Sequence, residues 1–235
     1  MTIGFGNGNF YQLYKHDNDR FNELFLSLLS CDKKANAIEL HTLNEEQINI
    51  LLDINKDILK DFDYISLHSP DVYNGWIFNK KLMEKIKLLN RKFNFQNIVY
   101  HPDRIIDFND LSNYKELPIS MENMDNDKTK YKTVEDMKYI LDKYNFGFTL
   151  DLQHCYVNDP SMKLAEDFHN KLWDKIVEYH ISAYKEWYPH HTLFQNNQDM
   201  IIKSLQQQNA PIIIESAFDA IWDHEMELDY IINSM

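Results

Sequence analysis

The chain has 235 residues, which fits one large domain, and its 44% hydrophobic and 26% charged residues are ordinary for a globular protein. Its net charge of −13 argues against broad binding to polyanions such as DNA, although bound metal cations or a local basic groove would reverse the sign where it matters. No segment has the roughly 20 apolar residues of a membrane span or the pattern of a secretory signal, and two cysteines cannot build a disulfide framework, so we expect a cytoplasmic protein without membrane contact.

Eight short apolar runs rich in β-branched and aromatic residues recur along the chain, and each is too short for an amphipathic helix. Runs of this kind suit strands that are buried on both faces, as in a parallel sheet. In chain order the expected strands cover residues 3–5, 37–40, 64–67, 97–100, 118–121, 148–150, 176–179 and 211–214.

Helical patterns lie between several of these runs. Apolar residues recur near a period of 3.6 over 45–60, which predicts one helix there. We expect Thr133 to cap a helix over 133–144, and Asp159 and Pro160 to supply the cap and first residue of another. A last helix is expected from about Asp219, while the connection over 102–117 is only weakly helical.

Eight strands that alternate with helices predict parallel pairing and right-handed crossovers. Their number favours a closed barrel over an open doubly wound sheet. The fold class expected is therefore α/β, a TIM (β/α)8 barrel that forms a single domain over residues 1–235, with some short or irregular helices.

Six of the eight expected strands are followed at once by His, Asp or Glu. A closed parallel barrel carries its chemistry at this end, because the loops after the strands converge on one mouth. The residues are His68, His101, Glu122, Asp151 with His154 three positions later, His180 and Glu215. Alone, the DxxH spacing of Asp151 and His154 fits an ordinary turn. Together, buried carboxylates and imidazoles would be costly to desolvate without a cation, so the recurrence predicts a metal site.

The side chains in this set also indicate the kind of metal. Imidazoles and carboxylates without a thiolate favour Zn²⁺, Mn²⁺, Fe²⁺ or Co²⁺ over Ca²⁺ or Cu⁺. The set exceeds what one tetrahedral zinc ion requires. We therefore expect two or three divalent ions, zinc before the others, with a carboxylate bridging two of them. Cys155 adjoins His154, but we expect it to point into the packing.

The segments LHSPDVYN, YHPD, SMENMD, LDLQH, EYHISAY and IIIES resemble, in order and spacing over the whole chain, the metal-site motifs of the xylose-isomerase-like barrel superfamily (AP endonuclease family 2). Within it they are most similar to the endonuclease IV branch, in which three zinc ions line the mouth of the barrel. The resemblance implies a first ion held by His68, His101 and Glu122. It implies a second ion, with Glu122 bridging, held by Glu122, Asp151, His180 and Glu215.

The third site departs from the pattern of that branch. It would combine His154 with an Asp-x-His pair after the seventh strand. His190 matches the histidine of the pair, but Tyr188 stands where the aspartate is expected. His191 is an alternative ligand or a surface residue.

His68 and His101 favour phosphoester hydrolysis, because an isomerase with one metal has no need of two further imidazoles. Clustered zinc would lower the pKa of a water molecule and stabilise both oxygens of the displacement. The expected catalytic residues are Glu122, Asp151 and Glu215, and either of the last two would orient the nucleophile.

The substrate is either abasic DNA or a smaller phosphorylated or sugar molecule. The loops after His68 and His180 are aromatic and nearly uncharged, whereas DNA would call for Lys and Arg around the mouth. Three of the five glycines lie in IGFGNG, and no phosphate-loop motif is present. The residues expected to contact substrate are His154, Tyr73, Trp76 and Trp187.

The alternative is a sugar or sugar-phosphate isomerase or epimerase, which the same resemblance also allows. It would use a single metal held by Glu122, Asp151, His180 and Glu215. Its chemistry would be proton transfer beside a carbonyl, to which Glu39 at the end of the second strand could contribute. A metal-binding barrel without catalytic activity is the third class.

Overall fold

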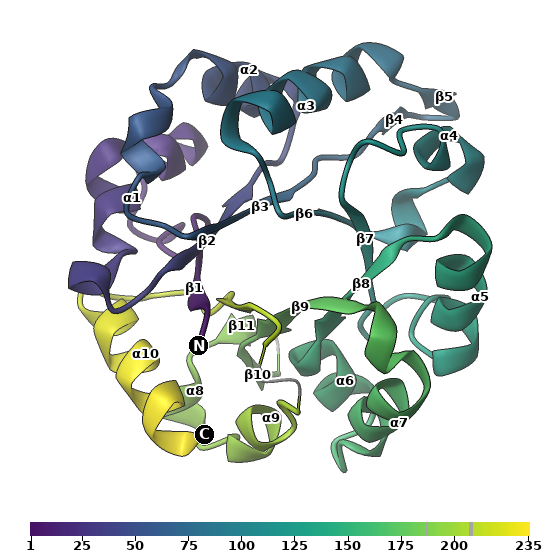
Figure 1. Cartoon of the computed structure of the whole chain (residues 1–235). Coiled ribbons are helices and arrows are strands. Elements are labelled where there is room, and N and C mark those ends of the chain that lie inside the picture. The colour runs from purple at the N-terminus through teal and green to yellow at the C-terminus, as the bar shows by residue number, and fades with distance from the viewer. Residues whose placement is uncertain (187, 207–208) are drawn as a thin grey trace.

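The computed structural model describes residues 1–186, 188–206 and 209–235, and its eight central strands close into a barrel that the helices surround (Figure 1). Neighbouring strands pair in parallel, and the last strand pairs with the first. The strands are β1 (Ile3–Gly6), β2 (Ala37–His41), β3 (Tyr64–His68), β6 (Asn97–Tyr100), β7 (Ile119–Glu122), β8 (Gly147–Asp151), β9 (Ile176–Ile181) and β12 (Ile212–Ile214). The predicted TIM barrel is confirmed, and each expected strand overlaps one of these.

The helices are short for a barrel of this kind, as expected. The α-helices are α1 (Glu23–Leu28), α2 (Glu45–Asp53), α3 (Lys80–Phe93), α4 (Phe108–Ser112), α5 (Val134–Tyr144), α6 (Leu152–Asn158), α7 (Lys163–Leu172), α8 (Leu193–Asn196), α9 (Asp199–Lys203) and α10 (Asp223–Ser234). The 3-10 turns are η1 (Asp17–Phe21), η2 (Cys31–Lys33), η3 (Lys56–Leu59), η4 (Pro102–Arg104) and η5 (Trp173–Lys175). None of the helices in the described part of the chain is long and apolar enough to cross a membrane.

Two small hairpins are inserted after strands of the barrel. One consists of β4 (Tyr73–Asn74) and β5 (Ile77–Phe78), and follows β3. The other consists of β10 (Ala183–Lys185) and β11 (Tyr188–His191), and follows β9. Both hairpins therefore belong to the loops at the carboxyl ends of the strands, where the sequence predicts the site.

Helix boundaries agree with the sequence where a local cap sets them and differ where another element does. The predicted cap of α5 is confirmed, because the Thr133 hydroxyl accepts the amide of Asp136 at 3.2 Å. The single helix expected over 45–60 is wrong, since α2 ends at Asp53 and η3 is separate. The ammonium group of Lys92, on α3, donates to the carbonyls of Leu51 and Leu52 at 3.1 and 2.6 Å, and so stabilises the end of α2.

Two further helix starts lie later than the sequence predicts. The last helix begins at Asp223 and not near Asp219, because the Asp223 carboxylate accepts the amides of Asp219 and Ala220 and holds a turn there. The helix after Asp159 begins at Lys163, so Pro160 is not its first residue. Asp159 still contributes a cap from a distance, since its carboxylate accepts the amide of Leu164 at 2.9 Å.

The interior of the barrel is built in layers, because successive strand residues alternate between inside and outside. A small apolar cluster of Ala37, Tyr64 and Ile213 fills part of the interior. A layer below the strand-end residues is largely polar, which differs from the aliphatic filling usual in these barrels. We call it the polar layer, and its members are Glu39, Ser66, Asn97, Ser120, Thr149 and Glu178. The upper layer carries the residues that the sequence predicts as metal ligands.

Gly4 in β1 is required by the close approach of β2. A Cβ atom added at Gly4 would lie 1.6 Å from the carbonyl oxygen of Ala37, so no side chain fits without moving the neighbouring backbone. The parallel pairing of Gly4 with Ala37 therefore depends on glycine at this position.

We expect the substitution Gly4→Ala to lower the free energy of unfolding by about 3 kcal/mol or more, because it separates two paired strands of a closed barrel. Urea denaturation followed by circular dichroism measures this. A matched control is Gly75→Asn, since Gly75 has φ +57° and open space around it, and Asn tolerates that conformation. A Gly4→Ala variant as stable as the wild type would contradict the close approach.

Glu227 anchors α10 to the rest of the barrel. Its carboxylate accepts the amides of Leu193 and Phe194 at 2.8 and 3.1 Å and the hydroxyl of Ser216. Burial raises the pKa of this carboxyl to about 7, and the hydrogen bonds from Leu193, Ser216 and Phe194 oppose the rise only in part. Glu227 therefore stays protonated in the fold over a pH range in which it ionises in the unfolded chain.

This difference predicts a pH-dependent stability. As the pH rises from about 4.5 to about 7, the unfolded state gains a charge that the folded state resists, so the contribution of Glu227 falls by about 1.4 kcal/mol per pH unit. The stability of the wild type should fall in this range relative to Glu227→Gln, whose side chain does not titrate. Denaturation of both proteins across the range tests this. A constant difference would mean that the hydrogen bonds keep the group ionised.

Candidate metal centre

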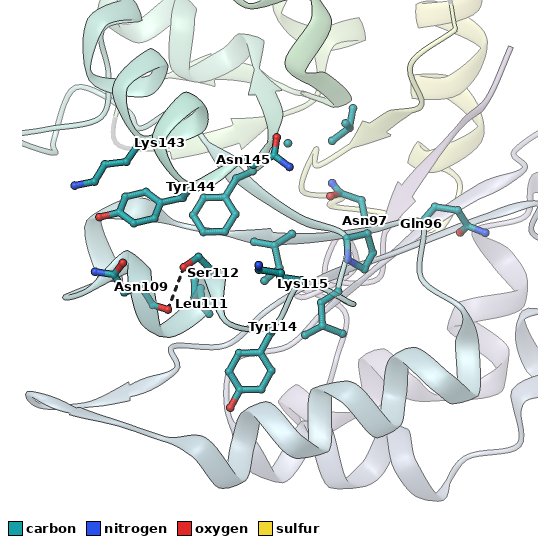
Figure 2. A pocket seen from close by; sticks show the side chains of 16 residues that line it. Gln96, Asn97, Asn109, Leu111, Ser112, Tyr114, Lys115, Lys143, Tyr144 and Asn145 are labelled. Carbon is teal, nitrogen blue, oxygen red and sulfur yellow. Dashed lines mark hydrogen bonds between the residues drawn. The ribbon is translucent and has the colours of Figure 1, made fainter.

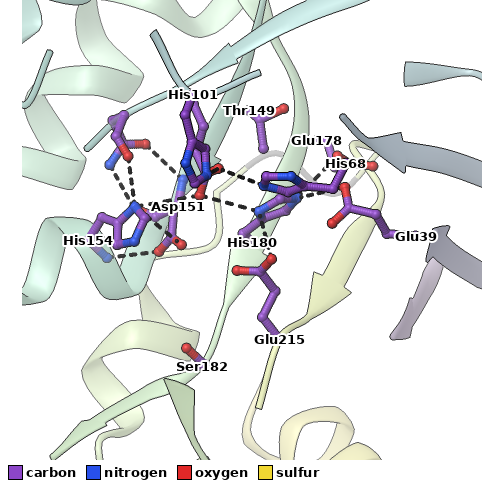
Figure 3. A network of polar contacts seen from close by, with 12 residues as sticks. Glu39, His68, His101, Thr149, Asp151, His154, Glu178, His180, Ser182 and Glu215 are labelled. Carbon is purple, nitrogen blue, oxygen red and sulfur yellow. Dashed lines mark hydrogen bonds and ion pairs between the residues drawn. The ribbon is translucent and has the colours of Figure 1, made fainter. Parts of the chain in front are cut away.

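Six of the predicted ligands converge at the carboxyl ends of the barrel strands, and all of them except Glu122 are labelled in Figure 3. Three are the last residues of β3, β7 and β8, one lies within β9, and two directly follow β6 and β12. In that order they are His68, Glu122, Asp151, His180, His101 and Glu215. The strands that carry them lie apart in the sequence, and only the closure of the barrel brings the side chains together.

The first group consists of His68, His101 and Glu122. The Oε2 atom of Glu122 lies 3.4 Å from Nε2 of His68 and 2.9 Å from Nε2 of His101. One ligand atom from each residue lies within 4.8 Å of the others, a spacing that one ion can span. The side chain of His101 is 35% exposed and those of the other two are at most 7% exposed, so this group reaches the rim of the mouth.

The second group shares Glu122 and lies deeper. The Oε1 atom of Glu122 lies 3.4 Å from Nδ1 of His180, and the same nitrogen lies 3.4 Å from Oε1 of Glu215. Asp151 completes this group, again within 4.8 Å. The two oxygens of Glu122 therefore face two different sets of ligands, as a bridging carboxylate would.

Several buried atoms of these groups have no hydrogen-bond partner among the described residues. They are Oε2 of Glu122, Oδ2 of Asp151, Nδ1 of His68 and Nδ1 of His180. A buried polar atom without a partner costs free energy, and native proteins rarely leave several together. Cations bound by the two groups would satisfy the atoms of Glu122, Asp151 and His180, so the donor set fits bound metal.

His180 is oriented from below by the polar layer. Its Nε2 atom lies 3.3 Å from Oε1 of Glu178, to which it is hydrogen-bonded, and 3.3 Å from Oε2 of Glu39. An N–H at Nε2 leaves the lone pair at Nδ1, the atom that faces Glu122 and Glu215. Carboxylates that fix the tautomer of a histidine in this way are typical behind metal ligands.

Glu178 was missed by sequence reasoning, and Glu39 lies one layer below the strand end at which it was expected to act. Glu178 also accepts a hydrogen bond from Asn97 at 2.9 Å, so it is held on two sides. Its position two residues before His180 on one strand is the signal that could have found it, because residues i and i+2 share a face.

Asp151 and His154 form a local turn and also contribute side chains to the site. One oxygen of Asp151 accepts the amide of His154 at 2.8 Å and caps α6, while the other oxygen faces the second group. Nδ1 of His154 lies 2.7 Å from the carbonyl of Asn123, which assigns the proton of the neutral ring to Nδ1. The cap therefore fixes the orientation of the Asp151 and His154 side chains at the start of α6.

The structure does not assemble a third group around His154 and His190 among the residues that it describes. Their rings lie 6.2 Å apart, and Nδ1 of His190 is 3.7 Å from Glu215 and 3.3 Å from the hydroxyl of Ser182. His191 instead contacts Asn196. The side chain of Tyr188 and the whole of Trp187 lie outside the described residues.

The remaining predicted residues belong to neither group. The hydroxyl of Tyr73 donates to Asp110 at 2.8 Å, which directs it toward α4. Trp76 is 86% exposed in the β4–β5 hairpin. Cys155 is fully buried, and burial holds the pKa of its thiol well above the usual value, in keeping with a packing role.

His41 is a further strand-end residue that sequence reasoning missed. It is the last residue of β2, and its ring lies 4.4 Å from the ring of His68. Burial and the neighbouring His68 hold its pKa well below the usual value, so this ring is neutral. Ending the second expected strand at Leu40 concealed it, because His41 occupies the next inward position after Glu39.

Without metal, burial and neighbouring charges shift the pKa values of the ligands in opposite directions. Burial raises the pKa of Asp151 to about 8, although His154 opposes the rise. For Glu122, burial acts in the same direction, but His101 and His180 hold its pKa well below the usual value. Burial lowers the pKa of His68, yet the carboxylates of Glu122 and Glu39 outweigh it and raise the pKa to about 9.

Two cavities differ in their relation to these groups. A cavity of about 690 Å³ lies at the amino-terminal ends of β6, β7 and β8, and its lining contains no histidine or carboxylate (Figure 2). A cavity of about 420 Å³ lies at the carboxyl ends of β1, β2 and β12 and is lined by His41, His190 and Glu215. Only the second adjoins the metal ligands, so it is the candidate substrate cavity.

No protein-family model matches the chain, and no curated protein sequence matches it. Solved structures with the same fold include the 3-keto-D-glucoside 4-epimerase YcjR from E. coli, with 12% identity, 99% of each chain covered and a TM-score of 0.65. SacUVDE has 14% identity over all of both chains and a TM-score of 0.63. A xylose isomerase domain containing protein from Salmonella typhimurium has 12% identity, covers 90% of this chain and 91% of its own, and has a TM-score of 0.57.

At these sequence identities the structural similarity supports a shared fold and no particular activity. The narrower resemblance to the endonuclease IV branch stays a prediction. The closed barrel, the order of its strands and these structural neighbours together establish that the chain has the TIM-barrel fold of these solved structures, as the sequence predicted.

Proposed function

We propose that this protein is a metal-dependent enzyme that hydrolyses a phosphoester, with two divalent ions, zinc before manganese, iron or cobalt. The observation that carries the proposal is the position of Glu122, whose two oxygens face two different sets of ligands. One ion would need only one of these sets. The first ion would be held by His68, His101 and Glu122, and the second by Glu122, Asp151, His180 and Glu215.

Ions bound here would polarise the phosphoryl oxygens and make a nearby water molecule more acidic. The protein supplies position and proton acceptors. Glu215 lies at the junction of the second group and the substrate cavity, so its carboxylate is placed to orient the attacking water. Asp151 is fixed by its cap on α6 and offers its second oxygen to the site. Glu178 keeps Nδ1 of His180 directed at the second group.

The features of the mouth favour a small phosphorylated or sugar substrate over damaged DNA. The cavity of about 420 Å³ has the size of a small-molecule site. The chain has three arginines and a net charge of −13, which is a poor match for the several phosphates of a duplex. His190 lines the cavity, and its ring lies 6.2 Å from that of His154, so both are candidates for substrate contacts or for a third ion.

The second candidate is a sugar isomerase or epimerase with one metal ion. It is favoured by the completeness of the second group alone, with Glu122, Asp151, His180 and Glu215 within ligand distance. The structural similarity to a 3-keto-D-glucoside 4-epimerase supports it further. In that reaction two carboxylates would exchange protons beside a carbonyl, and His68 and His101 would be dispensable.

Counting bound metal separates the candidates. Protein purified without chelator should hold about two zinc-type ions per chain under the proposed function. The substitution His101→Ala removes a ligand of the first ion only and should leave about one. Glu122→Gln weakens both groups and should leave fewer than one. Inductively coupled plasma mass spectrometry of the wild type and variants measures this.

The control for metal content is His16→Ala, because His16 is exposed and belongs to neither group. Circular dichroism shows whether each variant remains folded. A Glu122→Gln protein that still holds two ions would contradict the bridging role. A wild type with one ion that survives His101→Ala would support the isomerase.

Activity provides a second, independent prediction. A chromogenic phosphodiester, a phosphomonoester and an abasic duplex should be tested with the metal-loaded protein, and we expect turnover of one of the two small compounds. His101→Ala should lower kcat/KM by about 100-fold or more, because the ion it helps to hold is used in the transition state. Solvent deuterium entering a ketose or aldose, undiminished in His101→Ala, would instead establish the isomerase.

A further inference from the structure

The substrate cavity contains a buried positive charge that the metal chemistry does not use. Arg20, in η1, is 4% exposed and lines this cavity together with His41 and Glu215. Among the described residues its guanidinium forms no ion pair, although the chain has 37 acidic residues. Buried charges in proteins are almost always paired or bound to a ligand, so this arginine calls for an anion.

The protein holds the guanidinium in place but leaves part of it unused. Its Nε donates to the carbonyl of Asp17 at 2.8 Å, and its Nη1 approaches the carbonyl of His41 at 3.5 Å. An arginine has five N–H donors in a planar fork, and these contacts occupy two of them. In the described part of the chain no carboxylate forms an ion pair with the remaining donors, although the charge of Asp17 partly opposes the lowering of the Arg20 pKa by burial. The fork is therefore held in place with donors left for a further acceptor.

The loop after β1 keeps the space beside Arg20 open. A Cβ atom added at Gly8 would lie 3.7 Å from Nη1 of Arg20 and 3.6 Å from Nδ1 of His41. Gly6 and Gly8 both line the cavity, which explains the glycines of IGFGNG without a phosphate-loop motif. A side chain at Gly8 would occupy the position at which a ligand can reach the guanidinium.

Two residues of opposite charge line the cavity. Glu215 belongs to the second group of metal ligands, where only bound cations would attract an anion. Arg20 lines the same cavity, and its Nη1 approaches the carbonyl of His41. A ligand that contacts both residues would carry an oxyanion for Arg20 and a metal-binding group for the site at Glu215.

We propose that Arg20 binds a phosphate group at the end of a small substrate, so that the substrate class is a phosphorylated sugar or a molecule of similar size and charge. The inference rests on the proposed function in taking this cavity as the substrate site. A guanidinium fork matches phosphate oxygens in a bidentate geometry, and a cavity of about 420 Å³ excludes a duplex. The same anchor serves hydrolysis of a second phosphoryl group or isomerisation of the sugar.

The test uses inorganic phosphate as the probe and the protein as purified, at constant ionic strength. Isothermal titration calorimetry should show that Arg20→Met weakens phosphate binding at least tenfold. Arg91→Met is the matched control, since Arg91 is an exposed arginine on α3, and it should leave binding unchanged. Unchanged phosphate affinity in Arg20→Met would overturn the proposal.

A second variant guards against loss of folding in Arg20→Met. Gly8→Ala leaves the hydrogen bond from Arg20 to the carbonyl of Asp17 intact and places a methyl group at ordinary contact distance in the cavity. It should weaken phosphate binding while the unfolding temperature and metal content stay at wild-type values. Unimpaired phosphate binding in a folded Gly8→Ala protein would contradict the anchor.

The outcomes separate the anchor from the proposed function. Acetate should bind at least tenfold more weakly than phosphate, and equal affinity would overturn the phosphate assignment in favour of a carboxylate. Phosphate binding that depends on Arg20 in a protein without metal or turnover would support the anchor and refute the proposed function. If the protein binds metal and turns over substrate, but neither variant changes phosphate binding, the proposed function is supported and the anchor is refuted.

Discussion

The mouth of the barrel depends on one buried carboxylate, that of Glu122. Its oxygens lie 2.9 Å from a nitrogen of His101 and 3.4 Å from a nitrogen of His180, on opposite sides. Such a carboxylate is stable away from water only when positive charge lies on both sides. The imidazoles supply part of that charge when they are protonated, and metal ions would supply it without requiring protons. The remaining ligands surround this carboxylate and face the same positive charge.

Much of the fold and of the site follows from the sequence for a geometric reason. The strands are apolar runs with few alternatives, and closure of a parallel barrel places the residue at each strand end on a common rim. His68, Glu122 and Asp151 could therefore be placed together although 83 residues separate the first from the last. Helix ends could not be placed as well, because Lys92 on a neighbouring helix and the carboxylate of Asp223 set them.

The polar layer escaped prediction because runs such as AIEL and IVEY were interpreted as buried on both faces. In the structure the outward residues are apolar and the inward ones, such as Glu39 and Glu178, are polar. Polar and apolar residues do alternate in AIELH and YISLH. The same alternation is typical of a strand with one face in solvent, so it does not by itself indicate a polar barrel interior. Arg20 gave still less signal, since nothing near it in sequence distinguishes it from a surface arginine.

The polar layer has a consequence for the heat resistance of this barrel. Serine, threonine, asparagine and glutamate fill a space in which valine and isoleucine would pack with less cost of desolvation. The polar layer therefore exchanges packing stability for the fixed orientation of His180, whose Nε2 is held by Glu178. An aliphatic interior at these six positions would make the barrel more heat-resistant and leave the imidazole above it free to rotate.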